Sequence, residues 1–192
     1  AYNFWNTLVG PFDFLDQNYP VPQHICEFTN DLINNGKLEF DKSQNDHMTL
    51  TFHDSCNVAR ASRMGEEPGG QFTFPRAIIR ACCNKFFDMA EETIGESTYC
   101  CGGGGGLLTD DLIEVRVKGA KPRMDALQKV RRDHGVTHMA AICAICKAQF
   151  SKVMPYYDIP MTSIVSVHQL VSNAIILPGQ RTIDGEQNEH VN

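Results

Sequence analysis

The spacing of the cysteines constrains this chain more than any other feature of its sequence. Five of its eight cysteines follow segments with β-strand character: Cys56, Cys100, Cys101, Cys143 and Cys146. The intervals are 44 residues from Cys56 to Cys100 and 42 residues from Cys101 to Cys143. Each is about the length of a strand–helix crossover with an insertion. Because open parallel sheets bind ligands at the carboxyl ends of their strands, we expect the five sulfur atoms to converge on one crevice.

Short β-prone runs alternate with longer segments of helical spacing, which predicts an α/β fold of Rossmann-like βα units with a mostly parallel sheet. We expect strands at residues 48–52, 97–100, 136–142 and 161–167. We expect helices at residues 24–34, from Pro75 to Phe86, and at 108–117, 122–132, 147–154 and 168–176. Pro75 suits a first helical turn, and the apolar residues after it recur on one face.

The chain divides into three stretches of different character. Residues 1–47 are rich in aromatic residues and predict an arm or the edge of a preceding domain. Residues 48–177 carry the α/β pattern and the five cysteines, and residues 178–192 form a polar C-terminal tail with few large aliphatic side chains. The sequence begins with Ala1 rather than Met, so we expect a processed chain or a piece of a longer one.

Charge and hydropathy make two classes of protein improbable. The chain carries 17 Lys and Arg against 23 Asp and Glu, a net charge of -6, so we expect no nucleic-acid partner. Its longest apolar runs, residues 139–146 and 161–167, are far shorter than the roughly 20 residues of a transmembrane helix, so we expect no direct membrane span. Eight cysteines in 192 residues are too few for a small disulfide scaffold, which favours a reducing compartment.

Five thiolates at one site favour an iron-sulfur cluster over zinc. A structural zinc ion takes four ligands in a closed tetrahedron, so a fifth thiolate would remain uncompensated, whereas a cluster has several metal atoms to ligate. The run from Gly102 to Gly106 would allow backbone N–H groups, such as that of Gly103, to approach the cluster closely. A phosphate-binding loop is a poorer interpretation, because the run lacks the motifs of dinucleotide sites and P-loops.

The other three cysteines are not expected to be ligands. Cys82 lies on the apolar stripe of its helix with Cys83 beside it, and Cys26 has no partner at a useful spacing. Two rival classes stay open. One is an interaction module in which Cys143, Cys146 and two other cysteines bind zinc. The other is a thioredoxin-like enzyme that uses the same pair as a metal-free dithiol.

The arrangement Cys56, then Cys100-Cys101-Gly102, then Cys143-x-x-Cys146 resembles the cysteine-rich CCG domain of iron-sulfur oxidoreductases such as the B-type and D-type subunits of heterodisulfide reductase. The surrounding segments 51–60, 100–108 and 117–124 are most similar to the catalytic subunit of membrane complexes associated with dissimilatory sulfite reductase. The sequence shows one complete motif where the B-type subunit of heterodisulfide reductase has two. It also lacks the cysteine run that holds ferredoxin-type clusters.

The resemblance implies a non-cubane [4Fe-4S] cluster, held by the five CCG cysteines, at which a disulfide or trisulfide is cleaved reductively. It also implies partners: quinol-oxidising and electron-transfer subunits of a membrane complex, and a small sulfur-carrier protein as substrate. The location implied is cytoplasmic, on the inner face of the cell membrane. His53 and His168 lie near predicted strand ends and are candidates to supply protons as thiols form, although such histidines are more often structural.

Overall fold

The computed structural model describes residues 23–60, 63–64, 67–68 and 72–177, and its centre is a parallel sheet of three strands. The strands are β1 (Leu50–His53), β4 (His138–Ala141) and β5 (Ile164–Ser166), in the order β1-β4-β5. Phe52 pairs with Ala140, which in turn pairs with Val165. The α/β class and the parallel sheet predicted from the sequence are therefore confirmed.

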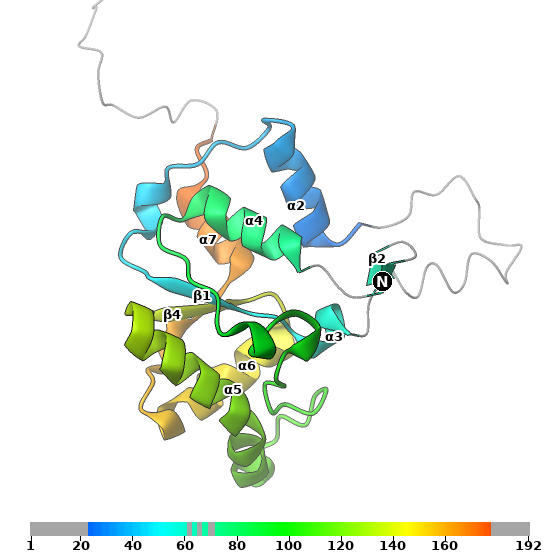
Figure 1. The fold of residues 1–192 in the computed structure, drawn as a ribbon, viewed down its shortest axis with the longest axis vertical. Coiled ribbons are helices and arrows are strands. Elements are labelled where there is room, and N and C mark those ends of the chain that lie inside the picture. Colours follow the sequence, from blue (N-terminus) through cyan, green and yellow to red (C-terminus); the bar gives the residue numbers. More distant parts are fainter. Residues whose placement is uncertain (1–22, 61–62, 65–66, 69–71, 178–192) are drawn as a thin grey trace, which may run out of the picture.

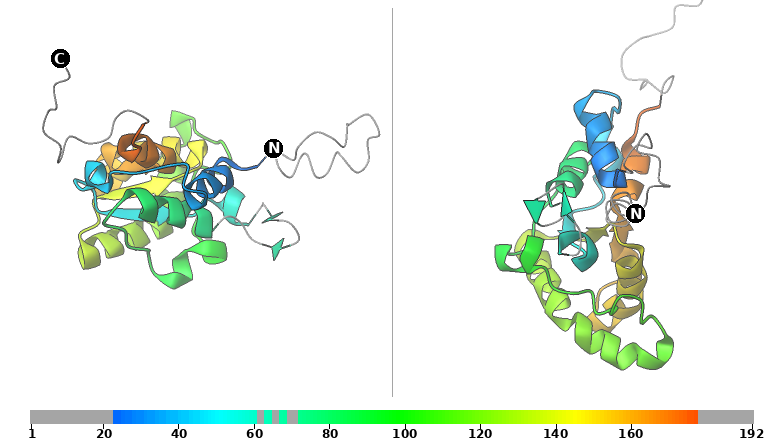
Figure 2. Two further views of the ribbon diagram at one scale, coloured as in Figure 1. Left: turned by 90° about the horizontal axis from the view of Figure 1, so that it is seen from above. Right: turned by 90° about the vertical axis from the view of Figure 1, so that its right-hand side faces the viewer.

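Helices cover both faces of the sheet; Figure 1 shows the three layers, and the turned views of Figure 2 show the same arrangement. On one face lie α2 (Ile25–Asn34), α4 (Thr73–Cys82) and α7 (Val167–Ala174), and on the other α5 (Ile113–His134) and α6 (Ala144–Val153). Side chains of a strand alternate between faces, so Leu50 and Phe52 enter the first core while His53 packs edge-on against Phe150 in the second.

The remaining elements are short. They comprise α3 (Cys56–Ala59), the strand pair β2 (Arg63–Met64) and β3 (Glu67–Pro68), and the 3₁₀ turns η1 (Lys42–Asn45), η2 (Glu91–Thr93), η3 (Gly95–Ser97), η4 (Asp110–Leu112), η5 (Met154–Tyr157) and η6 (Met161–Ser163). No helix among the described residues has both the length and the apolar character needed to cross a membrane.

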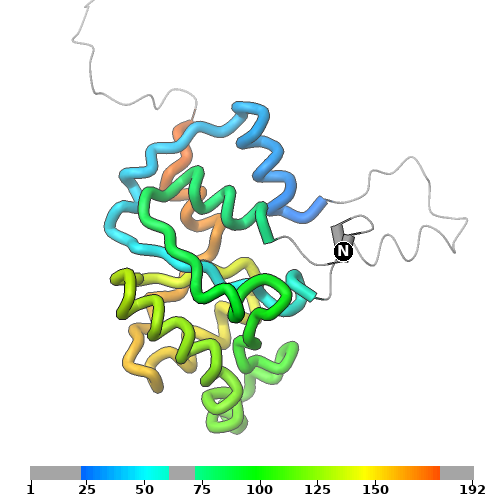
Figure 3. Tube along the Cα trace, in the orientation of Figure 1, coloured from blue at the N-terminus to red at the C-terminus, as the bar shows by residue number. Residues whose placement is uncertain are grey.

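The predicted aromatic arm lies partly outside the described residues, and its described part packs on the sheet. Helix α2 contacts α4, and Cys26 is fully buried in the core between them. Figure 3 shows the segment after α2 returning beside the end of α7, where Phe40 forms a β-bridge with Ile175. The predicted polar tail, residues 178–192, lies outside the described residues.

One predicted strand is wrong. Residues 97–100 are not extended in a sheet; the 3₁₀ turn η3 ends at Ser97, and a loop leads on to the cysteines. The additional pairing with β1 is made instead by the segment after α4, where Phe86 forms a parallel bridge with Leu50. The side chain of Thr98 bonds to the backbone oxygen of Asp54, an interaction between loop and strand end that a hydropathy pattern does not reveal.

The two helices predicted at 108–117 and 122–132 are one helix, α5, with Pro122 inside it. A proline there removes the hydrogen bond to the carbonyl of Lys118. Both residues are exposed, so water can solvate that carbonyl. The opposite side of α5 is buried on both sides of the proline, and this packing stabilises one continuous helix. The buried residues are Arg116, Ala120, Arg123, Met124, Leu127 and Val130.

Candidate functional site

Three of the five cysteines follow the carboxyl ends of two adjacent parallel strands, and they therefore lie at the same edge of the sheet. β1 ends at His53, and Cys56 opens α3 two residues after Asp54. β4 ends at Ala141, the register partner of His53. Cys143 then caps the amino terminus of α6 and Cys146 lies in its first turn. The pattern of a strand followed by a cysteine at a helix start therefore repeats on neighbouring strands.

The loop that carries Cys100 and Cys101 is tied to the end of β1 by hydrogen bonds. Thr98 Oγ1 donates to the backbone oxygen of Asp54 at 2.7 Å, and the Gly95 N–H donates to the Asp54 carboxylate at 3.0 Å. Arg60, which follows α3, donates to the backbone oxygen of Thr98 at 2.7 Å. A segment more than 40 residues away in sequence is thus held beside Cys56 without belonging to the sheet.

Asp54 is itself held by a buried ion pair. Both of its carboxylate oxygens accept hydrogen bonds of 2.8 Å from Arg76, whose side chain is 10% exposed against 3% for Asp54. Arg76 also bonds to Asp88 at 2.8 Å. Asp54 links the cysteine loop to the end of β1 and to Arg76, and the sequence analysis did not identify this position. Its position directly after a buried strand was the available signal.

Replacing Asp54 with alanine should lower the free energy of unfolding by about 3 kcal/mol. The change leaves the buried guanidinium of Arg76 with Asp88 as its one remaining carboxylate partner. It also removes the hydrogen bond that holds Gly95, at the start of the loop that leads to Cys100. Urea unfolding monitored by circular dichroism measures the loss. Arg80→Met is the matched control, since Arg80 is 58% exposed and lies 3.6 Å from Asp88, and it should cost no more than about 1 kcal/mol. Equal losses in the two variants would contradict this role of Asp54.

Gly102 lies backbone to backbone against α5. Its φ is +86°, and a Cβ at this position would stand 2.6 Å from the backbone nitrogen of Ala120 and 2.7 Å from the carbonyl oxygen of Arg116. The glycine of the Cys-Cys-Gly sequence is therefore required by both the backbone conformation and the close approach to a helix.

The five thiols form an inner and an outer group. Cys101 and Cys146 are the inner group, only 3% and 2% exposed. The outer group is Cys56 and Cys143, which are partly exposed, and Cys100, which is exposed. All eight cysteines of the chain are free thiols. The sulfur-lined site is consequently closed on the side of the sheet and open toward solvent.

Electrostatic interactions connect the thiols to one another. Hydrogen bonds from Cys100 and Cys146 hold the pKa of Cys101 far below its usual range. The pKa of Cys146 is correspondingly raised, mainly by Cys101 and Cys143, and that of Cys100 by Cys101 and by burial, with a contribution from Cys56. Cys100, Cys101, Cys143 and Cys146 are therefore linked to one another by these interactions, and Cys56 is linked to them through an electrostatic interaction with Cys100.

Backbone N–H groups also favour thiolates at this site. Gly102 N–H points to Cys100 Sγ at 3.3 Å, and Gly103 N–H to Cys101 Sγ at 3.4 Å. At the start of α6, the Cys146 side chain and two backbone N–H groups lower the pKa of Cys143 to about 6. Thiolates are the form in which cysteine binds metal.

The donor set has the composition of an iron-sulfur site, since all five side chains are thiols. Among the described residues, no three His, Cys, Asp or Glu side chains converge tightly enough to hold one metal ion. A structural zinc site requires four donors around one point. An iron-sulfur cluster distributes its cysteine ligands over several metal atoms, and five thiols from three segments suit that arrangement.

The two candidate histidines occupy different surroundings. His53 is fully buried beneath the cysteines, and desolvation with the nearby Arg123 lowers its pKa to about 3, so its ring is neutral at pH 7. Neither of its ring nitrogens has a hydrogen-bond partner among the described residues. His168 is half-buried at the start of α7, and its Nε2 lies 3.1 Å from Thr29 Oγ1 in α2.

The three other cysteines lie in the core on the opposite face of the sheet. Cys26, Cys82 and Cys83 belong to the cluster that includes Leu50 and Phe52. The sulfur atoms of Cys82 and Cys83 are 3.7 Å apart. Burial raises the pKa of Cys26 to about 12. Their place in the apolar core agrees with their exclusion as ligands.

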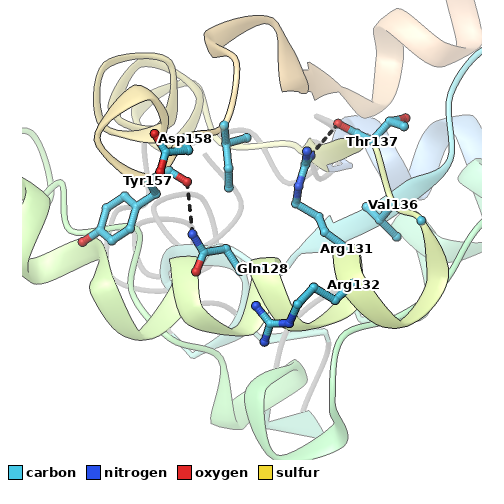
Figure 4. A pocket seen from close by; sticks show the side chains of 9 residues that line it. Gln128, Arg131, Arg132, Val136, Thr137, Tyr157 and Asp158 are labelled. Carbon is cyan, nitrogen blue, oxygen red and sulfur yellow. Dashed lines mark hydrogen bonds between the residues drawn. The ribbon is translucent and has the colours of Figure 1, made fainter.

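A cavity of about 550 Å³ lies away from the cysteines (Figure 4). Val136 and Thr137, just before β4, contribute to it, so it is at the amino-terminal edge of the sheet. In Figure 4, Gln128 reaches the backbone oxygen of Tyr157 at 3.0 Å, and Arg131 reaches that of Thr137 at 3.1 Å. None of the nine lining residues is a cysteine.

Comparison with known proteins points to one family. The family model for the cysteine-rich CCG domain matches residues 50–151. The chain is 44% identical over 154 residues to an Hdr-like menaquinol oxidoreductase iron-sulfur subunit of Archaeoglobus profundus, and 42% identical over 154 residues to iron-sulfur subunit 2 of that type from Archaeoglobus fulgidus. Each match covers 80% of this chain and 26% of the relative.

A more distant similarity extends to a methanogen enzyme. The chain is 28% identical over 181 residues to the D-type subunit of the dihydromethanophenazine:CoB–CoM heterodisulfide reductase of Methanosarcina mazei, a match that covers 89% of the chain and 37% of the relative. No solved structure matches the chain significantly. The chain thus spans about a quarter of the length of the Archaeoglobus relatives.

Proposed function

Because the chain belongs to the cysteine-rich CCG domain family, we propose that it is the cluster-binding domain of a heterodisulfide-reductase-type iron-sulfur oxidoreductase. Cys56, Cys100, Cys101, Cys143 and Cys146 are the proposed ligands. Two observations support the proposal: Cys56, Cys143 and Cys146 follow the ends of adjacent strands, and Cys101 interacts with both Cys100 and Cys146. The proposed cofactor is a [4Fe-4S] cluster of the non-cubane type.

The proposed reaction is the reductive cleavage of a disulfide or trisulfide. A disulfide takes up two electrons and two protons as its S–S bond breaks, and two thiols form. The bound cluster would supply electrons singly and offer iron as a place for substrate sulfur. The residues of the chain have two roles in this reaction. The inner thiolates hold the cluster, and the exposed side at Cys100 leaves room for substrate to approach.

Proton supply is the proposed role of the histidines. His53 is neutral and lies beneath the site, so it would act by accepting a proton on one ring nitrogen while releasing one from the other. His168 lies with its ring against Thr29, which makes it the weaker candidate.

The proposed electron donor is a quinol-oxidising membrane complex. The Archaeoglobus relatives are named as menaquinol oxidoreductase subunits, which supports this source of electrons. We further propose peripheral association with the membrane through partner subunits, and a small sulfur-carrier protein of sulfite reduction as the disulfide or trisulfide substrate.

Metal analysis and electron paramagnetic resonance test the proposal. The protein purified without oxygen should contain about four iron atoms per chain. Oxidised protein should give a resonance that changes when 2-mercaptoethanol is added, because the thiol binds iron. Ethylene glycol, in which a hydroxyl replaces the thiol, is the matched control and should leave the spectrum unchanged.

Two other results would contradict it. About one zinc and no iron per chain would identify the rival zinc module. A colourless, metal-free protein that reduces disulfides would identify a dithiol enzyme that uses Cys143 and Cys146.

A further inference from the structure

Arg123 is a fully buried arginine of helix α5 that contacts the segment leading to Cys100. Its side chain is 0% exposed. One terminal nitrogen donates to the Thr93 backbone oxygen and to Thr98 Oγ1, the latter at 2.8 Å, and the other lies 2.9 Å from Met89 Sδ. The guanidinium carbon is 5.7 Å from the ring centre of Tyr99. Arg123 therefore contacts the residues that lead directly into Cys100.

All of these contacts are with neutral groups. Among the described residues, no carboxylate lies within 4.0 Å of the Arg123 guanidinium, and its Nε has no hydrogen-bond partner. Two further buried arginines in the described part of the chain do have a carboxylate nearby: Arg76 is paired with Asp54, and Arg116 has Asp110 at 3.7 Å. A buried charge without a counter-charge costs several kcal/mol.

The carboxylate with which Arg123 interacts, that of Asp54, is already paired with another cation. Asp54 and Asp88 form ion pairs with Arg76 and Arg80. Arg123 takes no part in these ion pairs. Burial lowers its pKa to about 10, so the guanidinium is still protonated at pH 7.

The charge of Arg123 also acts on the cysteine site. Arg123 interacts electrostatically with Asp54 and Tyr99 and, more weakly, with Cys146, which is one of the two inner thiols. Arg60 is the other cation tied to this loop, but it is exposed, so water screens its charge.

We propose that Arg123 is the internal counter-cation of the iron-sulfur cluster and that its charge sets the cluster's reduction potential. This inference rests on the proposed function, because it requires a cluster at the five cysteines. A fixed positive charge in a buried, weakly screened place stabilises the more negative, reduced state. Arg123 acts from behind the ligands and needs no contact with substrate.

Redox titration of the cluster-loaded protein, monitored by electron paramagnetic resonance, tests the proposal. Arg123→Met should lower the ratio of reduced to oxidised cluster at a fixed potential at least tenfold, which is about 59 mV for a one-electron couple. Arg123→Lys keeps the charge but not the fork of donors, and should stay within threefold of the wild type. Arg132→Met removes an exposed charge from the same helix and should leave the ratio of reduced to oxidised cluster unchanged. A purely structural role would affect the Met and Lys variants at position 123 alike.

A second pair of variants leaves Arg123 in place, in case its replacement prevents folding. Met89→Glu puts a carboxylate beside the guanidinium and should lower the ratio of reduced to oxidised cluster at least tenfold. Met89→Gln has a neutral side chain of equal size and should leave that ratio unchanged. An unchanged potential in both Arg123→Met and Met89→Glu, with iron bound, would overturn the inference. Absence of iron from the wild-type protein would instead refute the proposed function, so the two failures are distinguishable.

Discussion

Cys101→Ser is expected to abolish cluster binding, with less than one-tenth of the wild-type iron in protein purified without oxygen. Cys101 is the buried thiol on which the interactions of Cys100, Cys146 and the Gly103 N–H converge. A serine hydroxyl is nearly isosteric, but it is a harder donor and is not ionised near neutral pH, so it replaces a thiolate on iron poorly. Iron and sulfide analysis, together with the visible absorption of the cluster, measures the loss.

Cys83→Ser is the matched control for this experiment. Cys83 is also buried and also follows another cysteine directly, but it lies in the core on the other face of the sheet. It should therefore retain the wild-type iron content. A Cys101→Ser protein with full iron, or a Cys83→Ser protein without it, would show that the wrong vicinal pair has been assigned to the cluster.

Gly102→Ala is expected to have the second largest effect, a loss of about 3 kcal/mol or more in the free energy of unfolding. Roughly 1–2 kcal/mol arises from the left-handed backbone conformation, since φ is +86°. The rest arises because the new Cβ would lie 2.6 Å from a backbone nitrogen of α5, which cannot move aside as a side chain can. Thermal unfolding should show a decrease in Tm of about 10 °C, accompanied by loss of iron.

Gly105→Ala separates the cost of the left-handed backbone conformation from the cost of the Cβ clash with α5. Gly105 also has a positive φ, +76°, but nothing lies within 4 Å of the position its Cβ would take. This variant should show only the conformational cost, roughly 1–2 kcal/mol, and should keep its cluster. If Gly102→Ala were as mild as Gly105→Ala, the packing of the loop against the helix would not be what requires the glycine.

The sequence predicted those parts of the fold that depend on local periodicity. Three of the four predicted strands are present, because alternating or continuous apolar residues identify a buried strand without knowledge of its neighbours. The error at residues 97–100 has the opposite cause. That segment is held by Thr98 and Gly95 through contacts with Asp54, more than 40 residues earlier. Such long-range polar contacts leave no periodic signal.

Helix α5 shows why one breaker residue can mislead. A proline usually ends a helix or occupies its first turn, which is why Pro122 predicts a new helix start. The apolar spacing continues through Pro122, however, and the proline lies on the exposed side. When the apolar spacing is followed over both predicted helices, it indicates one continuous helix. It also places Arg116 and Arg123 on the buried side, the signal that identifies them as internal charges.

The sequence named five thiols as a set of candidate ligands, which stays a prediction, but it did not show their arrangement. Cys26, Cys82 and Cys83, which it did not name as ligands, lie in the core on the opposite face of the sheet. The sequence could not show the difference between buried and exposed thiols, the ion pair at Asp54 or the buried charge at Arg123. These depend on the packing of α4 and α5 around the loop, which no short motif encodes.

The inner and outer groups of thiols have a consequence for the lifetime of the site in air. Oxygen and peroxide arrive from solvent and meet Cys100 first, whereas Cys101 and Cys146 are shielded by protein. Because an oxidant must reach a sulfur atom before it can react with it, damage begins on the exposed side. A centre that is open to its reactant cannot exclude an oxidant that is much smaller than the reactant, so its chemistry depends on surroundings without oxygen.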